Sequence, residues 1–149
     1  MPTHSETRNL PYSAQQMYDL VADVRSYPQF LPWTAAARIL KEEDHGDHHV
    51  MEADLVISFK VFRERFTSRV LLWDADKKIE TAYLDGPFKY MKSNWSFEDQ
   101  PGGCTVYFDV DFEFRNAILQ GIIGVVFNDA MQRVVRAFEA RAHKLYGHG

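Results

Sequence analysis

The sequence lacks the features that mark secreted, disulfide-stabilised and membrane-spanning proteins. Cys104 is the one cysteine among 149 residues, so no intramolecular disulfide can form. The N-terminus has neither the basic nor the apolar region of a signal peptide, and no apolar run approaches the roughly eighteen residues of a spanning helix. We therefore expect a cytoplasmic protein whose contact with any membrane is peripheral.

The sequence also lacks an excess of positive charge. Seventeen Lys and Arg residues stand against twenty-one Asp and Glu, a formal net charge of −4, which gives no general electrostatic attraction to nucleic acid. It shows no internal repeat, no low-complexity segment and no linker, and its length fits one domain. We expect a single domain over residues 1–149 with no DNA partner, in which any basic patch is local.

Catalytic and cofactor motifs are absent as well. The sequence contains no nucleophile elbow, phosphate-binding glycine loop, paired zinc-ligand motif or dinucleotide fingerprint. Glu64 shares the strand parity of Phe66 and would suit proton transfer if it were buried, but a bulge would turn it outward, and we favour the outward position. We predict no catalytic residue, no metal site and no cofactor.

Two groups of polar residues need separate interpretation. The His and Asp residues at 44–49 are of metal-ligating types, yet they occupy a predicted hairpin turn, where such residues are common for backbone and solubility reasons. Arg63, Arg65 and Arg69 form a basic stripe on one face of a predicted strand. This stripe either meets phosphates of lipid or RNA, or pairs with Glu52 and Asp54 across a hairpin, and we favour the pairing.

The longest periodic pattern lies at the C-terminus, where apolar residues recur at helical spacing over 116–146. Asn116 is a typical N-cap and Gly147 a typical stop. The helix would be about 45 Å long, so its apolar stripe must cross several strands. Gly121 and Gly124 interrupt it at a cost of about 1 kcal/mol each, which indicates either a frayed first turn or close helix-to-sheet contact, or else a pliable, apolar flap over a cavity.

The preceding chain predicts a strand at 3–10, a short helix that a capping box at Ser13 and Gln16 begins, and an apolar turn or helical stub at 27–33. Six more strands and the long helix follow, and this order (β-α-α-β6-α, in which the 6 counts strands) predicts an α+β fold, with a curved seven-stranded antiparallel sheet around the last helix. The aromatic inner face either closes an ordinary core or lines a ligand cavity. The six further strands are predicted at 38–43, 49–59, 62–73, 79–84, 88–97 and 106–114.

Several short motifs carry a family resemblance across nearly the whole chain. They are residues 27–33 (YPQFLPW), 66–70 (FTSRV), 86–89 (GPFK) with Met91, Trp95 and Phe97, and 112–116 (FEFRN) leading into 138–142 (FEARA). Together they resemble the coenzyme-Q-binding proteins of the START-like, polyketide cyclase superfamily. Thr34, Met91 and Ser93 depart from that family, which often has cysteine, leucine and asparagine at these positions.

The resemblance implies a helix-grip fold with an apolar tunnel that binds ubiquinone or a related polyisoprenoid lipid. The protein would be a non-enzymatic carrier that supports respiratory electron transport at the inner face of the respiratory membrane. The same family includes ribosome-associated toxins that block subunit joining, so ribosome association is the alternative, and a cyclase-like enzyme is a third. Parity, helical phase and the resemblance predict the lipid-binding residues Phe30, Leu31, Trp33, Phe59, Phe66, Met91, Trp95, Phe108, Phe112, Ile122, Ile123, Val126, Phe127 and Met131.

Overall fold

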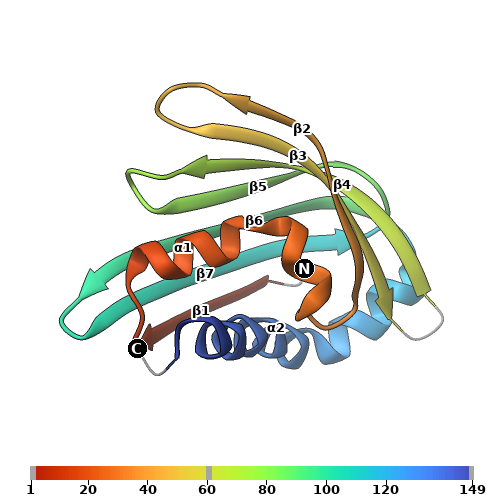
Figure 1. Cartoon of the computed structure of the whole chain (residues 1–149). Helices are drawn as coiled ribbons and strands as arrows, with labels where there is room; N and C mark the ends of the chain where they lie inside the picture. The colour runs from red at the N-terminus through yellow and green to blue at the C-terminus, as the bar shows by residue number, and fades with distance from the viewer. Residues whose placement is uncertain (1–2, 60–61, 148–149) are drawn as a thin grey trace.

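The computed structural model describes residues 3–59 and 62–147, apart from the side chains of Phe59, Phe62, Ile123, Val126 and Phe127. Seven strands form one antiparallel sheet in the order β1-β7-β6-β5-β4-β3-β2, with α1 and α2 on one face (Figure 1). The expected α+β helix-grip architecture is confirmed. Its elements are β1 (Thr3–Leu10), α1 (Ala14–Ala22), the 3-10 helix η1 (Val24–Gln29), β2 (Thr34–Asp44), β3 (His49–Phe59), β4 (Phe62–Trp73), β5 (Lys78–Asp85), β6 (Phe88–Gln100), β7 (Gly103–Phe114) and α2 (Ala117–Tyr146).

The capping box that opens α1 is present as predicted. The Ser13 hydroxyl accepts a hydrogen bond from the Gln16 backbone N–H at 3.0 Å, and the Gln16 side chain accepts one from the Ser13 N–H at 2.9 Å. The helical stub that follows starts earlier than predicted, at Val24, and includes Pro28. It carries the chain from α1 to β2.

The strands differ from prediction mainly at their ends. The predicted strands at 49–59 and 62–73 match β3 and β4 from end to end. In contrast, β2 already begins at Thr34, and β6 and β7 extend toward each other until Gln100 pairs with Gly103. Backbone pairing across a tight hairpin holds these polar extensions, which have no hydrophobic alternation to reveal them.

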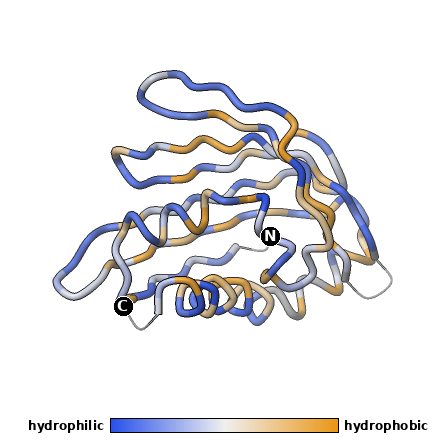
Figure 2. Tube along the Cα trace, in the orientation of Figure 1, coloured by the Kyte–Doolittle hydropathy of each residue, from blue (hydrophilic) through white to orange (hydrophobic). Residues whose placement is uncertain are grey.

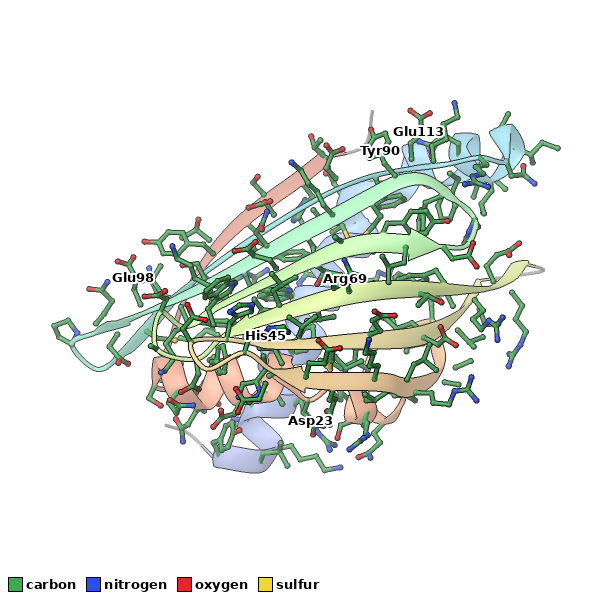
Figure 3. The ribbon with its side chains drawn as sticks, turned by 90° about the horizontal axis from the view of Figure 1, so that it is seen from above. Asp23, His45, Arg69, Tyr90, Glu98 and Glu113 are labelled. Atoms are coloured by element: carbon green, nitrogen blue, oxygen red, sulfur yellow. The ribbon has the colours of Figure 1, made fainter. Side chains whose placement is uncertain are left out.

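Three arginines on the outer face of the sheet, Arg38, Arg65 and Arg69, are paired with acidic residues. Arg69, labelled in Figure 3, lies opposite Glu52 in the sheet and approaches it to 3.5 Å. Arg38 and Arg65 approach Asp54 to 3.6 Å and 3.9 Å, and Asp54 is only 6% exposed. The favoured pairing across the hairpin is confirmed for Arg65 and Arg69, whereas Arg63 of the same stripe is exposed and has no ion pair among the described residues.

The C-terminal helix has the predicted ends. The Asn116 side chain accepts hydrogen bonds from the backbone N–H groups of Ile118 and Leu119 at 2.9 Å and 3.1 Å, and Gly147 caps the other end. Hydrophobic and hydrophilic residues alternate along α2 and along the strands (Figure 2). The second half of α2 is buried through Ala130, Val135, Phe138 and Ala142. In the first half Leu119 is buried as well, and the Gln120 side chain accepts a hydrogen bond from the Phe114 N–H of β7 at 2.8 Å.

A polar network fixes α2 to the edge strand β1. His4 approaches Glu6 at 2.8 Å and Asn128 of α2 at 3.3 Å, and Arg8 joins Glu6 to Glu139 of α2, the latter at 3.0 Å. These contacts lie at or after residue 128 of the helix. The network therefore leaves the first turns of α2 without a polar attachment to β1 among the described residues.

Candidate functional site

A cavity of about 280 Å³ lies between the inner face of the sheet and α2. Its walls come from residues 24–34, from strands β3 to β7 and from the second half of α2. One long helix therefore does not fill the curved sheet, and the inner aromatic residues line a cavity rather than close an ordinary core.

Most of the predicted lipid-binding residues with described side chains meet at this cavity. The members of the predicted set that line it are Leu31, Trp33, Phe66, Met91, Trp95, Phe108, Phe112 and Met131. They come from the segment after η1, from β4, β6 and β7, and from α2. Strand parity and helical phase thus bring residues far apart in sequence to one site. The predicted Phe59, Ile123, Val126 and Phe127 lie outside the described side chains.

Two predicted residues with described side chains, Phe30 and Ile122, are not among those that line the cavity. The Phe30 ring packs edge-on against Phe138 at 5.3 Å, and the Arg141 guanidinium lies 5.2 Å from its centre, so the ring forms a second layer behind the wall. Among the described side chains of α2, the first on the cavity is Ala130, eight residues after Ile122.

The main omission from the sequence prediction is Phe88. Its ring is buried and stacks on Phe114 at 4.7 Å, with Phe66 and Phe112 edge-on at 5.2 Å and 5.4 Å. A register irregularity between Phe88 and Tyr90 shifts the strand parity. The irregularity lets an even-numbered residue share the inner face with odd-numbered ones, which simple alternation cannot indicate.

Trp33 is held in an unusual backbone conformation. Its φ is 61°, in the left-handed region that bulky side chains rarely adopt. Its carbonyl accepts a hydrogen bond from the Ser58 N–H at 2.8 Å, which ties the segment to β3. Such conformations cost about 1–3 kcal/mol and concentrate at functional sites, so the placement of this indole at the cavity favours a role in binding.

The cavity wall is electrically neutral. None of the described residues that line it is Asp, Glu, His, Lys or Arg. Tyr27 lines it, but its hydroxyl donates to the Val21 carbonyl at 2.5 Å, and burial, then the charge of Asp23, raises the pKa of this phenol well above its usual value. The wall therefore offers no group poised to exchange a proton near neutral pH, and it suits an uncharged, apolar molecule.

Other candidate groups lie apart from this cavity. Glu64 is exposed at the start of β4, but it pairs with Ile57, which lines the cavity, and the β3–β4 register contains no irregularity, so the bulge that we favoured is not seen there. On the β2–β3 hairpin the rings of His45 and His48 stack at 5.1 Å, and His48 stacks on Trp73 at 4.2 Å. Among the residues described, no group of three or more His, Cys, Asp and Glu is placed to hold a metal ion. Within the same ranges, no helix combines the length and the hydropathy needed to cross a bilayer.

Comparison with known proteins gives a family and several full-length relatives. The family model "Polyketide cyclase / dehydrase and lipid transport" matches residues 10–139. A "Ribosome association toxin RatA" from Rickettsia prowazekii is 38% identical over 148 residues, which cover 97% of this chain and 99% of the relative. The "Coenzyme Q-binding protein COQ10 homolog B, mitochondrial" from Xenopus laevis is 31% identical over 97% of this chain and 59% of the relative. The solution structure of the 18 kDa protein CC1736 from Caulobacter crescentus is 32% identical, covers 99% of both chains and has a TM-score of 0.83.

Proposed function

Because the chain belongs to the polyketide cyclase / dehydrase and lipid transport family, we propose that it binds a neutral isoprenoid lipid in its cavity and acts by associating with ribosomes. The observation that supports lipid binding is the aromatic, uncharged wall of a cavity of about 280 Å³. Each methylene moved from water into such a site contributes about 0.8 kcal/mol, so an isoprenoid tail supplies a large part of the binding free energy.

Ribosome association is supported by the relatives rather than by a described basic surface. The relative named as a ribosome association toxin is more similar than the coenzyme-Q-binding one, at 38% against 31% identity, and it matches over 99% rather than 59% of its own length. Two arginines of the outer stripe, Arg65 and Arg69, are paired with acids, and the net charge is −4. Of this stripe only Arg63 has no ion pair among the described residues, so we propose that most of the contact lies on another local surface.

Carriage of ubiquinone is the second candidate. It is favoured by the cavity together with the relative that is named for coenzyme Q binding. It needs no ribosome contact, but it needs a place where the lipid can pass between protein and membrane. The two candidates therefore make different predictions about the partners of the purified protein.

One preparation of the full chain tests both candidates. Its lipids are extracted and identified by mass spectrometry, and the same protein is sedimented with ribosomal subunits. We expect an isoprenoid lipid in the extract and saturable quenching of Trp33 and Trp95 fluorescence by added short-tail ubiquinone. We also expect the protein to co-sediment with a ribosomal subunit and to reduce the joining of the two subunits. Bound quinone without co-sedimentation would favour the carrier, whereas no lipid and no fluorescence change would contradict lipid binding altogether.

The start of α2 is the proposed entrance for the lipid. A Cβ added at Gly121 or Gly124 would meet nothing within 4 Å, so close packing on the sheet does not require glycine at these positions. Ile118 and Val125 in the same turns are 72% and 86% exposed. An exposed apolar segment next to a lipid cavity is suited to peripheral contact with a bilayer.

Replacing both glycines by alanine is expected to stiffen this segment. The Gly121→Ala, Gly124→Ala variant should gain up to about 1 kcal/mol of stability per site and should exchange quinone with lipid vesicles more slowly. Stopped-flow fluorescence of quinone transfer measures the rate, with Leu145→Ala at the exposed far end of the helix as control. A double variant that transfers quinone as fast as the unaltered protein would place the entrance elsewhere.

A further inference from the structure

Three hydroxyl side chains form a polar patch inside the otherwise apolar cavity. Ser68 of β4, Thr81 of β5 and Ser93 of β6 all line it. Thr81 pairs directly with Ser93, and Val70, two residues along β4 from Ser68, pairs with Thr81. Same-face neighbours on this diagonal are about 7–8 Å apart, within reach of one small group of atoms.

The apolar surroundings separate this patch from the rest of the wall. On one side Ser68 pairs with Ala53 of β3, and on the other Ser93 pairs with Val110 of β7. Both neighbours are buried and also line the cavity. The hydroxyls thus occupy one defined place on three adjacent strands.

These hydroxyls are available to a ligand. In the part of the chain that the structure describes, the side chains of Ser68, Thr81 and Ser93 make no hydrogen bond to another protein group. The Tyr27 and Thr34 hydroxyls at the same cavity are instead used, because they donate to the carbonyls of Val21 and Pro32. Ser68 is only 3% exposed, yet its hydroxyl oxygen is not among the fully buried side-chain atoms without a partner, so it is open to the cavity and can donate to a polar atom of a bound molecule.

We propose that Ser68, Thr81 and Ser93 form a head-group subsite that recognises an uncharged lipid head with hydrogen-bond-accepting oxygens, such as the carbonyl pair of a quinone. This inference rests on the proposed lipid binding and specifies its chemistry. A fatty acid carboxylate fits less well, since no described residue lining the cavity carries a positive charge to offset its burial. A pure hydrocarbon would leave all three hydroxyls unpaired. With the quinone head at the hydroxyls, its isoprenoid tail lies against aromatic residues such as Trp95 and Phe108, whose rings stack at 4.2 Å.

Removing the hydroxyls tests the subsite. The variants Ser68→Ala, Thr81→Val and Ser93→Ala, singly and together, are titrated with a short-tail ubiquinone and with farnesene, an isoprenoid without oxygen, by tryptophan fluorescence. Each substitution is expected to weaken quinone binding about threefold to tenfold, the equivalent of one hydrogen bond, and the triple variant most of all. Affinity for farnesene should stay within about twofold of that of the unaltered protein, which also shows that the cavity is intact.

The control and the contrary results separate this inference from lipid binding itself. Ser96→Ala, on the opposite face of β6, should change neither affinity. Unchanged quinone binding by the triple variant, or an equal loss for farnesene, would overturn the head-group subsite while the lipid cavity stands. If the unaltered protein binds farnesene but not quinone, the subsite is wrong; if it binds neither probe, the proposed lipid binding is wrong as well.

Discussion

Replacing Gly103 by alanine is expected to lower the free energy of unfolding by about 3 kcal/mol, the upper part of the range for overpacking a folded interior. An added Cβ would lie 1.9 Å from the carbonyl oxygen of Leu10 and 3.0 Å from the Cα of Pro11. Both obstacles are backbone atoms, so no side-chain rotation can relieve the clash. The end of β1 would have to leave β7, where Leu10 pairs with Cys104.

Urea unfolding followed by circular dichroism measures this loss. Gly124→Ala is the matched control, because the same added methyl meets nothing within 4 Å on an exposed turn of α2 and should stabilise the protein by up to about 1 kcal/mol. The two alanines should therefore shift the midpoint in opposite directions. A Gly103→Ala variant within about 0.5 kcal/mol of the unaltered protein would mean that β1 does not approach β7 as closely as described.

Much of the fold could be predicted because its signals are local. The Ser13 and Gln16 capping box and the Asn116 cap each depend on residues within three positions of one another. The strands of the hairpin between β3 and β4 were also predicted correctly, since they match the ranges 49–59 and 62–73. Such features follow from backbone hydrogen bonding and from a strict two-residue period, which sequence displays directly.

The cavity was harder to predict because its details depend on contacts between distant residues. Phe88 joins the wall through a register irregularity that leaves no mark on hydrophobic alternation. Phe30 leaves it because Phe138 and Arg141, more than a hundred residues later, draw its ring into a second layer. The family was recognised at the level of its lipid-transport fold, while ubiquinone as ligand stays a prediction that the more similar RatA relative does not favour.

The aromatic contact that holds α2 on the sheet leads to a second prediction. Phe138 is 3% exposed, and its ring meets Trp95 of β6 edge-on at 5.2 Å, Phe30 at 5.3 Å and Tyr27 at 5.5 Å. It thus joins three parts of the chain, namely the helix, the sheet and the segment around η1. The ring also lines the cavity, so its removal would enlarge a space that already exists, and the neighbouring side chains would not close it.

Phe138→Ala is therefore expected to cost about 4 kcal/mol of unfolding free energy, a large share of the roughly 5–15 kcal/mol that a domain of this kind has. Urea unfolding measures it, and Val125→Ala, at a position of the same helix that is 86% exposed, should change stability by less than about 0.5 kcal/mol. Because the substitution enlarges the apolar cavity, added short-tail ubiquinone should restore more stability to this variant than to the unaltered protein. A loss below about 1 kcal/mol would show that α2 is held by its polar contacts to β1, through Arg8 and Glu139, rather than by this ring.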